Sequence, residues 1–399
     1  MKGSLALWYD EATQEKSADA VAEGKAPAVE LHFNLWRDLD SEPQSFLDIG
    51  VRFDVDIQQI SRLHFFIPTP IEERAVSDLA GIMRDRRTLH AVFNTVASVG
   101  ITFDGGFEVN FDGSAGLKFF EVDCGTDVEF ASMRLDDGSF GTTITLRSNF
   151  FERVRQVGAK EGFAPYIRLR IALDERAVKA FIEDVSPGDW IVLSSFVRKE
   201  IAEFRINERR NFPDELLSRE TKFPVIRTIH YFLVRDLRFE LVDSHTPFQK
   251  MRRLEANLWR HYLMPGFTPD AAERMLIYHW KAARTNEAPL TSFVALASFR
   301  APRNNLFLYA LAAVVIGAIG AGIHTLAVEL VFPVLKRLHV EEAGAHGPSW
   351  ITLLVVLVLL AVVAFALLQV RQPWFGWMRQ GWVRWRQRRA RRRLGRRQT

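Results

Sequence analysis

Apolar and polar residues alternate along several stretches in the N-terminal part of the chain. Residues 47–57 carry Leu, Ile, Val, Phe, Val and Ile at every second position, separated by Asp, Gly and Arg. The same period of two runs through 29–35, 167–173 and 237–241. This period is typical of a strand with one buried face, so we predict strands at these positions.

Turn residues separate further strand-like segments. Asp-Gly pairs at 112–113 and 137–138 each lie between apolar alternating segments, which favours tight hairpins. We therefore expect residues 1–243 to form a mainly β domain, an antiparallel sandwich or barrel with some helices. One such helix is predicted over residues 71–86, directly after Pro70.

The spacing of apolar residues changes after residue 243. From Pro247 to Tyr262 they recur at the spacing of a helix. Thr268-Pro269-Asp270 combines an N-capping residue with a proline at the first helical position, which predicts a second helix ending near Arg284. We expect residues 244–304 to form a helical connector.

Two long apolar runs follow, Leu306–Phe332 and Trp350–Val370. A bilayer core of about 30 Å needs about 20 helical residues, and both runs are long enough. Their uniformly apolar composition favours insertion over burial as a hairpin inside a soluble domain. We predict that residues 305–370 form two transmembrane helices joined by a short external loop.

The charges indicate the orientation of these helices. Residues 371–399 contain eleven arginines, and Arg300 and Arg303 precede the first run. Basic residues beside spans are retained in the cytoplasm. We therefore predict a multi-pass protein of the inner (plasma) membrane with both termini cytoplasmic. The single cysteine, Cys124, is compatible with a reducing compartment.

The C-terminal tail also carries tryptophans on one side of a potential helix. They are Trp374, Trp377, Trp382 and Trp385. Tryptophan prefers the headgroup region and arginine prefers anionic surfaces. We expect residues 371–399 to bind anionic headgroups at the membrane interface, with a solvated basic tail as the alternative. Basic residues beside a span favour lipid over nucleic acid as the partner.

Small residues repeat every four positions in the first apolar run, at Ala313, Gly317 and Ala321. Such a stripe lets two helix backbones approach closely. His324 and Glu329 lie further along the same run, and ionisable groups in a span favour contact with protein or water. These residues predict a transmembrane contact or pore in a homo-oligomer, or packing against the second span.

Known catalytic patterns are absent from the sequence. It contains no phosphate-binding loop with lysine, no Gly-x-Ser-x-Gly and no His-Glu-x-x-His. Cys124 lies between Asp123 and Asp127, which disfavour a thiolate, so we interpret it as structural. The histidines, among them His32, His64, His90 and His230, are scattered without the spacing of metal ligands. No metal site is predicted, and the sequence does not indicate whether the protein binds a cofactor.

Arginines provide the main indication of a ligand. Arg168 and Arg170 lie on one face of a predicted strand, and Arg205, Arg209 and Arg210 lie in a predicted helix or turn. Converging guanidinium groups can bind a small anionic ligand such as a phosphate. The alternative is ordinary charge on a solvated surface.

Together these patterns favour a cytoplasmic binding or sensor domain coupled to a two-helix membrane module. By analogy of architecture, the chain could be an oligomerising membrane effector, for example in bacterial anti-phage defence. Two alternatives stay open. One is a membrane-tethered enzyme acting on lipid or envelope precursors, and the other is a scaffold that localises a protein partner. The lack of a catalytic motif favours a protein that is not an enzyme.

Overall fold

The computed structural model describes residues 3–12, 26–39, 45–158, 160–185, 197–218, 220–263, 269–285, 290–302 and most of 310–325. The chain divides into two compact units, Met1–Arg303 and Asn304–Thr399. The first unit is mainly β, as its alternating pattern predicts.

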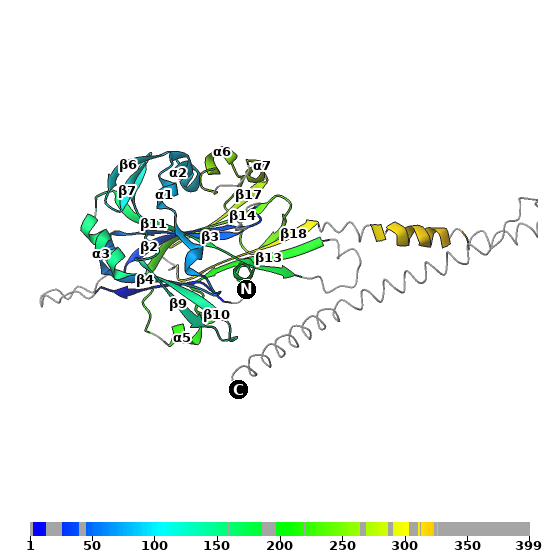
Figure 1. The fold of residues 1–399 in the computed structure, drawn as a ribbon, viewed down its shortest axis with the longest axis horizontal. Coiled ribbons are helices and arrows are strands. Elements are labelled where there is room, and N and C mark those ends of the chain that lie inside the picture. Colours follow the sequence, from blue (N-terminus) through cyan, green and yellow to red (C-terminus); the bar gives the residue numbers. More distant parts are fainter. Residues whose placement is uncertain are drawn as a thin grey trace, which may run out of the picture. The chain divides into compact units, whose positions relative to one another are not determined.

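A ten-stranded sheet forms the centre of the first unit (Figure 1). Its main path follows the order β16 (Lys250–Arg253), β17 (Met275–Ala283), β14 (Val225–Asp236), β2 (Ala28–Trp36), β3 (Phe46–Phe53), β11 (Phe163–Ala172), β8 (Ser114–Phe120), β7 (Gly106–Phe111) and β6 (Ala97–Phe103). The short β5 (Val76–Asp78) also pairs with β11. Most neighbours are antiparallel, but β14 pairs with β2 and β11 pairs with β8 in parallel. The sheet is therefore mixed, whereas the sequence predicts antiparallel hairpins alone.

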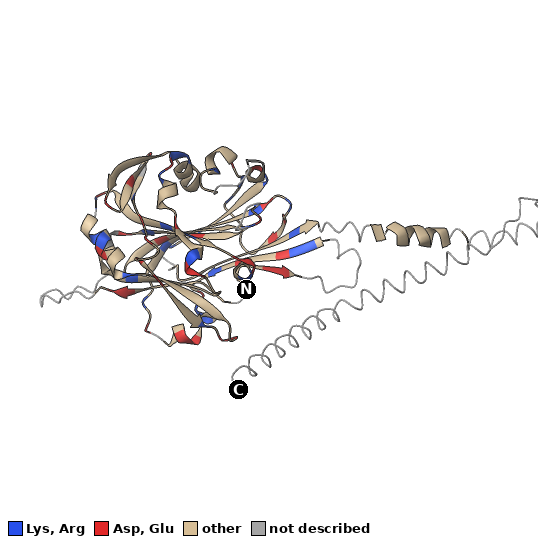
Figure 2. Cartoon of the chain, viewed as in Figure 1, with Lys and Arg blue, Asp and Glu red and all other residues tan. Residues whose placement is uncertain are grey.

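Two four-stranded sheets complete the β structure. One has the order β1 (Ala6–Glu11), β4 (Ile60–Ile67), β10 (Phe140–Leu146) and β9 (Val128–Arg134). The other has the order β12 (Ile182–Val185), β13 (Val197–Ile206), β18 (Phe293–Pro302) and β15 (Glu240–Ser244). The predicted Asp-Gly hairpins are confirmed, because they join β7 to β8 and β9 to β10. Figure 2 shows acidic and basic residues side by side along β13.

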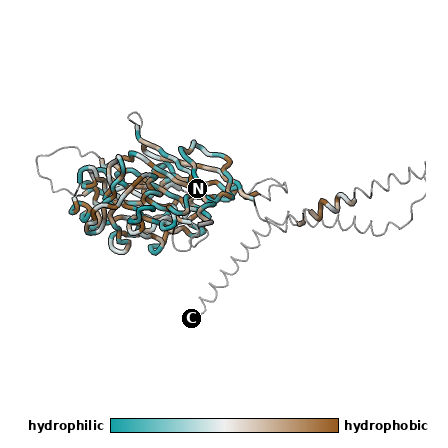
Figure 3. The backbone as a smooth tube through the Cα atoms, turned by 90° about the horizontal axis from the view of Figure 1, so that it is seen from above, coloured by the Kyte–Doolittle hydropathy of each residue, from teal (hydrophilic) through white to brown (hydrophobic). Residues whose placement is uncertain are grey.

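The main core lies on one face of the central sheet. Leu31, Phe33 and Ile49 are buried there and belong to the same cluster as Leu7 of β1 and Phe204 of β13. Each such side chain contributes roughly 1.5–3 kcal/mol through burial. Figure 3 shows apolar and polar residues interspersed along the chain.

Helices cover the opposite face of the central sheet (Figure 1). These are α1 (Ala80–Met83), α2 (Arg86–Phe93), α6 (Ala256–Trp259) and α7 (Pro269–Glu273). The other short helices are α3 (Ser148–Val157), α4 (Glu175–Val178), α5 (Asp214–Leu217) and the 3-10 turns η1 (Val55–Gln59), η2 (Glu73–Ala75) and η4 (Arg209–Asn211). A second apolar cluster forms between these covering helices and the sheet, and it includes Trp36, Met83, Trp259 and Ile277.

The single helix predicted over residues 71–86 is wrong. This stretch contains η2, the strand β5 and the short α1. The Asp85 side chain accepts a hydrogen bond from the backbone N–H of Thr88, and α2 begins at Arg86. An N-cap at this position separates the two helices.

The helical connector predicted over residues 244–304 is also wrong. The segment supplies β16, β17 and β18, and among its described residues only α6 and α7 are helical. The helix predicted from Pro269 does begin there, but it ends at Glu273, and β17 follows. Met275 and Ile277 pack in the cluster under the helices, whereas Tyr278 and Trp280 pack in the main core. A strand buried on both faces loses its period of two, so its apolar run resembles that of a helix.

The predicted membrane segments fall mostly outside the described residues. Residues 313–322 are helical and include Ala313, Gly317 and Ala321, all of which are exposed. Of the helices that the structure describes, none is both long and apolar enough to span a bilayer. His324, Glu329 and the whole tail, with Trp374, Trp377, Trp382 and Trp385, lie outside the described residues.

Candidate ligand-binding site

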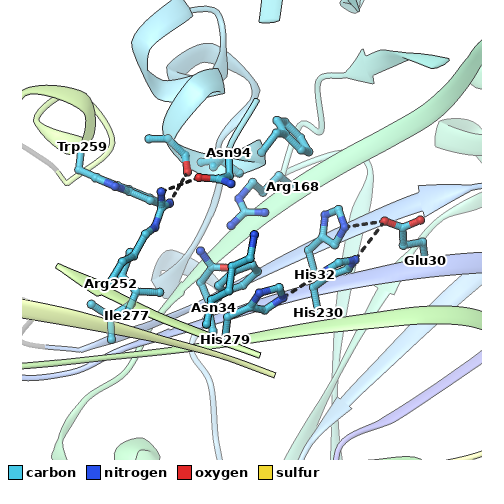
Figure 4. A pocket seen from close by; sticks show the side chains of 16 residues that line it. Glu30, His32, Asn34, Asn94, Arg168, His230, Arg252, Trp259, Ile277 and His279 are labelled. Atoms are coloured by element: carbon cyan, nitrogen blue, oxygen red, sulfur yellow. Dashed lines mark hydrogen bonds and ion pairs between the residues drawn. The ribbon is translucent and has the colours of Figure 1, made fainter. Parts of the chain in front are cut away.

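A cavity of about 260 Å³ lies between the central sheet and the helices that cover it (Figure 4). Its floor comes from β2, β14, β17, β16 and β11, and its cover comes from α2 and α6. Polar and charged side chains line much of it, including Glu30, His32, Arg168, His230 and His279.

Strand register explains how residues distant in sequence meet at this cavity. One row of cross-strand partners runs from β17 to β11, in the order Lys281, His230, His32, Gly50 and Arg168. Side chains in such a row project from the same face of a sheet. The parallel pairing of β14 with β2 is what places His230 beside His32.

Gly50 provides space within this row. A Cβ atom at this position would lie 2.1 Å from the Tyr166 hydroxyl oxygen and 3.0 Å from Nη1 of Arg168. Any side chain here would therefore displace both groups. The glycine allows the tyrosine and the arginine to lie across β3 towards the cavity.

Glu30 connects two histidines. Oε1 of Glu30 lies 3.0 Å from Nε2 of His32 and 3.7 Å from Nε2 of His230. The three groups can each offer one ligand atom, and all these atoms lie within 4.8 Å of one another. The other oxygen, Oε2, accepts a hydrogen bond of 3.3 Å from Nη1 of Arg52.

The second ring nitrogen of each histidine is also occupied. Nδ1 of His32 lies 3.1 Å from the Tyr166 hydroxyl, and Nδ1 of His230 lies 3.0 Å from Nε2 of His279. Figure 4 shows both contacts to Glu30 and the His230–His279 contact as dashed lines. These contacts fix the ring planes so that both Nε2 atoms face Glu30.

Burial sets the protonation of these groups. It lowers the pKa of His32, and together with the nearby His32 ring it lowers the pKa of His230 to about 3. Burial and then Lys281 and Lys250 lower the pKa of His279 to about 4. Each of the three imidazoles is therefore neutral at pH 7.

Glu30 has the opposite charge preference. Burial alone would raise the pKa of Glu30. The hydrogen bond from His32, and then the electrostatic effects of His32 and Arg52, instead lower it to about 2. The carboxylate is therefore ionised at pH 7, beside two neutral imidazoles. This is the protonation state in which carboxylates and histidines bind metal ions.

Arg168 is fully buried, and no carboxylate forms an ion pair with it among the described residues. Its Nε donates to the Tyr262 hydroxyl at 2.8 Å, and its Nη1 donates to the Tyr166 hydroxyl at 3.0 Å. Nη2 is buried without a hydrogen-bond partner. In Figure 4 the guanidinium group points into the cavity.

Arg170 differs, although it projects from the same face of β11. Its Nε and Nη2 donate to Asp48 at 2.7 and 3.2 Å, and its Nη1 donates to the backbone oxygen of Tyr262 at 3.0 Å. Asp48 also accepts hydrogen bonds from Trp36 and Tyr262. Arg170 is thus part of a closed, buried network that does not line the cavity.

The other three predicted ligand-binding arginines lie elsewhere. Arg205 is on β13 and pairs with Glu203, and Arg210 pairs with Glu208. Arg209 lies over the Phe223 ring, with its guanidinium carbon 5.2 Å from the ring centre. The five arginines therefore do not converge, and only Arg168 faces the cavity. The interpretation of Arg168 and Arg170 as surface charge is wrong, because both are buried.

Further basic and aromatic groups line the cavity near α2 and α6. Lys250 and Arg252 come from β16. Nη1 of Arg252 donates to Oδ1 of Asn94 at 2.7 Å, which fixes the end of α2. The indole N–H of Trp259 is buried without a hydrogen-bond partner. The charged lining thus consists of one carboxylate and three cations.

The interpretation of the histidines as scattered is wrong for His32 and His230, which meet at Glu30. Their separation of nearly 200 positions hides the contact, which depends on strands β2 and β14 pairing in parallel. One local signal was present, because Glu30, His32 and Asn34 occupy the polar positions of one alternating segment. That pattern indicates a shared face, but it does not show that helices cover the face.

Cys124 has no catalytic environment. Burial, and then Asp78 and Asp123, raise the pKa of its thiol to about 11, in agreement with the predicted effect of neighbouring acids.

No protein-family model matches the sequence, and no curated protein matches it significantly.

Proposed function

We propose that the β domain binds a small anionic ligand in this cavity and acts as the sensor of a membrane-anchored protein. One observation carries the proposal: Arg168 is buried beside the cavity without a carboxylate partner, and its Nη2 has no hydrogen-bond partner. A buried charge costs several kcal/mol unless it is paired. A bound anion would supply the missing pair.

The donors of the cavity suit such a ligand. Arginine binds carboxylates and phosphates through two parallel N–H groups, and Nη2 of Arg168 is available for one of them. The unpartnered indole N–H of Trp259 provides a second buried donor. Lys250 and Arg252 add positive charge that would attract an anion. The volume of about 260 Å³ suits a small molecule rather than a macromolecule.

Anion binding would act through the membrane module. We propose that the apolar runs 306–332 and 350–370 insert in the inner membrane and that anion binding changes how copies of the chain associate there. The small residues Ala313, Gly317 and Ala321 support close helix contact in such an oligomer. The arginine- and tryptophan-rich tail supports binding to anionic headgroups.

A second candidate function is an enzyme that acts on a lipid or envelope precursor. The observation that favours it is the ionisable cluster of Glu30, His32 and His230 at the cavity. No serine, threonine or cysteine lines the cavity among the described residues, which disfavours a hydroxyl or thiol nucleophile. A scaffold function has no comparable support in the described surface.

Calorimetric titration of the full-length chain in detergent tests the anion site. Inorganic phosphate, nucleotides and dicarboxylates are the probes, and mass spectrometry of the same samples detects any turnover. We expect Arg168→Met to weaken binding of the best probe by at least about 30-fold, because a buried ion pair is lost. Arg205→Met is the matched control and should bind as the unmodified chain does.

Equal binding by the Arg168→Met variant would overturn the anion site. Turnover of a probe would favour the enzyme over the sensor. For the coupling, the probe should change dye release from vesicles that contain the full-length chain. Unchanged release, despite measured binding, would exclude control of the membrane module.

A further inference from the structure

The geometry points to a binding site for a divalent transition-metal ion, with Oε1 of Glu30 and Nε2 of His32 and of His230 as its ligands. This site lies at the same cavity as Arg168, but it does not depend on the proposed anion binding. Figure 4 shows the three side chains converging on one point of the cavity wall.

The ligand atoms have nearly the separation that a bound metal requires. Two ligands at about 2.1 Å from a metal, at tetrahedral or octahedral angles, lie roughly 3.0–3.4 Å apart. The Glu30–His32 and Glu30–His230 separations are 3.0 and 3.7 Å. All three ligand atoms lie within 4.8 Å of one another, so rotations of the side chains that bring the two imidazole nitrogens closer would complete the coordination.

The surrounding contacts support metal ligation more than a simple hydrogen-bonded cluster. Metal-binding histidines nearly always use their other ring nitrogen to bond a second group, which orients the ring. Here Nδ1 of His32 bonds Tyr166 and Nδ1 of His230 bonds His279. Arg52 holds the second oxygen of Glu30 in the same way. All three ligands are thus oriented by a partner.

The donor set indicates which metals fit. Two imidazoles and one carboxylate suit Zn²⁺ or Fe²⁺, whereas Mg²⁺ and Ca²⁺ prefer oxygen ligands. Three protein ligands leave at least one coordination position open, as in sites where a metal binds a further molecule. The Tyr166 hydroxyl contacts Nδ1 of His32 and accepts a hydrogen bond from Nη1 of Arg168, so it links a proposed metal ligand to the proposed anion-binding arginine.

Metal titration of the full-length chain, without an affinity tag and after treatment with a chelator, tests the site. Zn²⁺ and Co²⁺ are the probes, metal per chain is measured by plasma mass spectrometry, and the visible spectrum of Co²⁺ reports its ligands. We expect one tightly bound ion per chain. His230→Ala and Glu30→Gln should each weaken binding by at least about 100-fold, and His279→Ala should weaken it by roughly 10- to 100-fold.

Two control variants make the result specific. His64→Ala removes a histidine of β4, in another sheet, and should retain full binding. Arg205→Met, at an arginine of β13 that does not line the cavity, should also retain the metal. Anion binding by Arg168→Met is measured separately, so that failure of either proposal can be recognised. Thermal unfolding with and without Zn²⁺ shows whether each variant is folded.

The proposal is overturned if the chain binds no metal, or if His230→Ala and Glu30→Gln bind it as tightly as the unmodified chain. Equal weakening by His64→Ala would also overturn it, because binding would then come from other histidines. Should His230→Ala fail to fold, Glu30→Gln and the Co²⁺ spectrum decide the question.

Discussion

Arg168 and Arg170 lie two residues apart on the same face of β11, with exposed fractions of 0% and 3%. Arg170 meets a carboxylate, because its guanidinium donates twice to Asp48, which also accepts from Trp36. Arg168 meets only the hydroxyl groups of Tyr166 and Tyr262 and retains an unpartnered nitrogen at the cavity. The same residue type at equivalent depth therefore has two different environments.

This difference separates a structural group from a candidate binding group. A folded chain normally satisfies its buried polar atoms, and the Arg170–Asp48 network follows that rule. Arg168 is an exception beside a cavity, which indicates that its charge is available to a bound ligand. The neighbouring cluster of Glu30, His32 and His230 lies at the same cavity. The Arg170–Asp48 network and the candidate binding site thus occupy adjacent rows of one sheet face.

The largest expected effect on stability comes from removing the carboxylate partner of Arg170. Asp48→Asn would leave Arg170 as a buried cation without its counter-charge. We expect the free energy of unfolding to fall by about 3–5 kcal/mol, measured by chemical denaturation of the full-length chain. The double variant Asp48→Asn/Arg170→Met removes both charges and should recover much of this loss. A loss below about 1 kcal/mol in the single variant would show that the pair contributes little.

An intermediate effect is expected where the two networks adjoin. The Cβ atom added by Gly50→Ala would lie 2.1 Å from the Tyr166 hydroxyl oxygen, so the tyrosine and Arg168 must move. Overpacking of this kind costs about 1–3 kcal/mol, and the displaced arginine should also bind anions less well. Gly81→Ala is the control, since its Cβ atom would meet nothing within 4 Å. If both variants behave alike in unfolding and in titration, Gly50 is not a spacing residue.

The strands on either side of this site show what a sequence can predict. Segment 29–35 has one apolar and one polar face, so its period of two identifies β2 directly. In β17, Ile277 and Tyr278 are both buried, one against the helices and one in the main core. Over residues 275–278 the strand is apolar on both faces, and the sequence therefore predicts a helix there.

The site itself depends on long-range contacts that no local pattern contains. Glu30 and His32 occupy polar positions of an alternating segment, and nothing near them in sequence indicates that α2 and α6 cover that face. His230 reaches Glu30 only through the parallel pairing of β14 with β2. Asp48, one polar position of an alternating strand, is fully buried and forms an ion pair with Arg170.

The smallest expected effect on stability belongs to Arg168, and it is the strongest test of the comparison. Arg168→Met removes a buried charge that has no carboxylate partner, so the desolvation penalty disappears. The variant loses two hydrogen bonds to tyrosine hydroxyls, which contribute about 1 kcal/mol each. These terms oppose one another, and we expect the free energy of unfolding to be unchanged or raised, within about 1 kcal/mol. Arg170→Met, measured in parallel by the same denaturation, should instead lose about 3–5 kcal/mol because Asp48 is left unpaired. Equal losses in the two variants would mean that Arg168 is as structural as its neighbour, and the unpartnered nitrogen would then not mark a binding site.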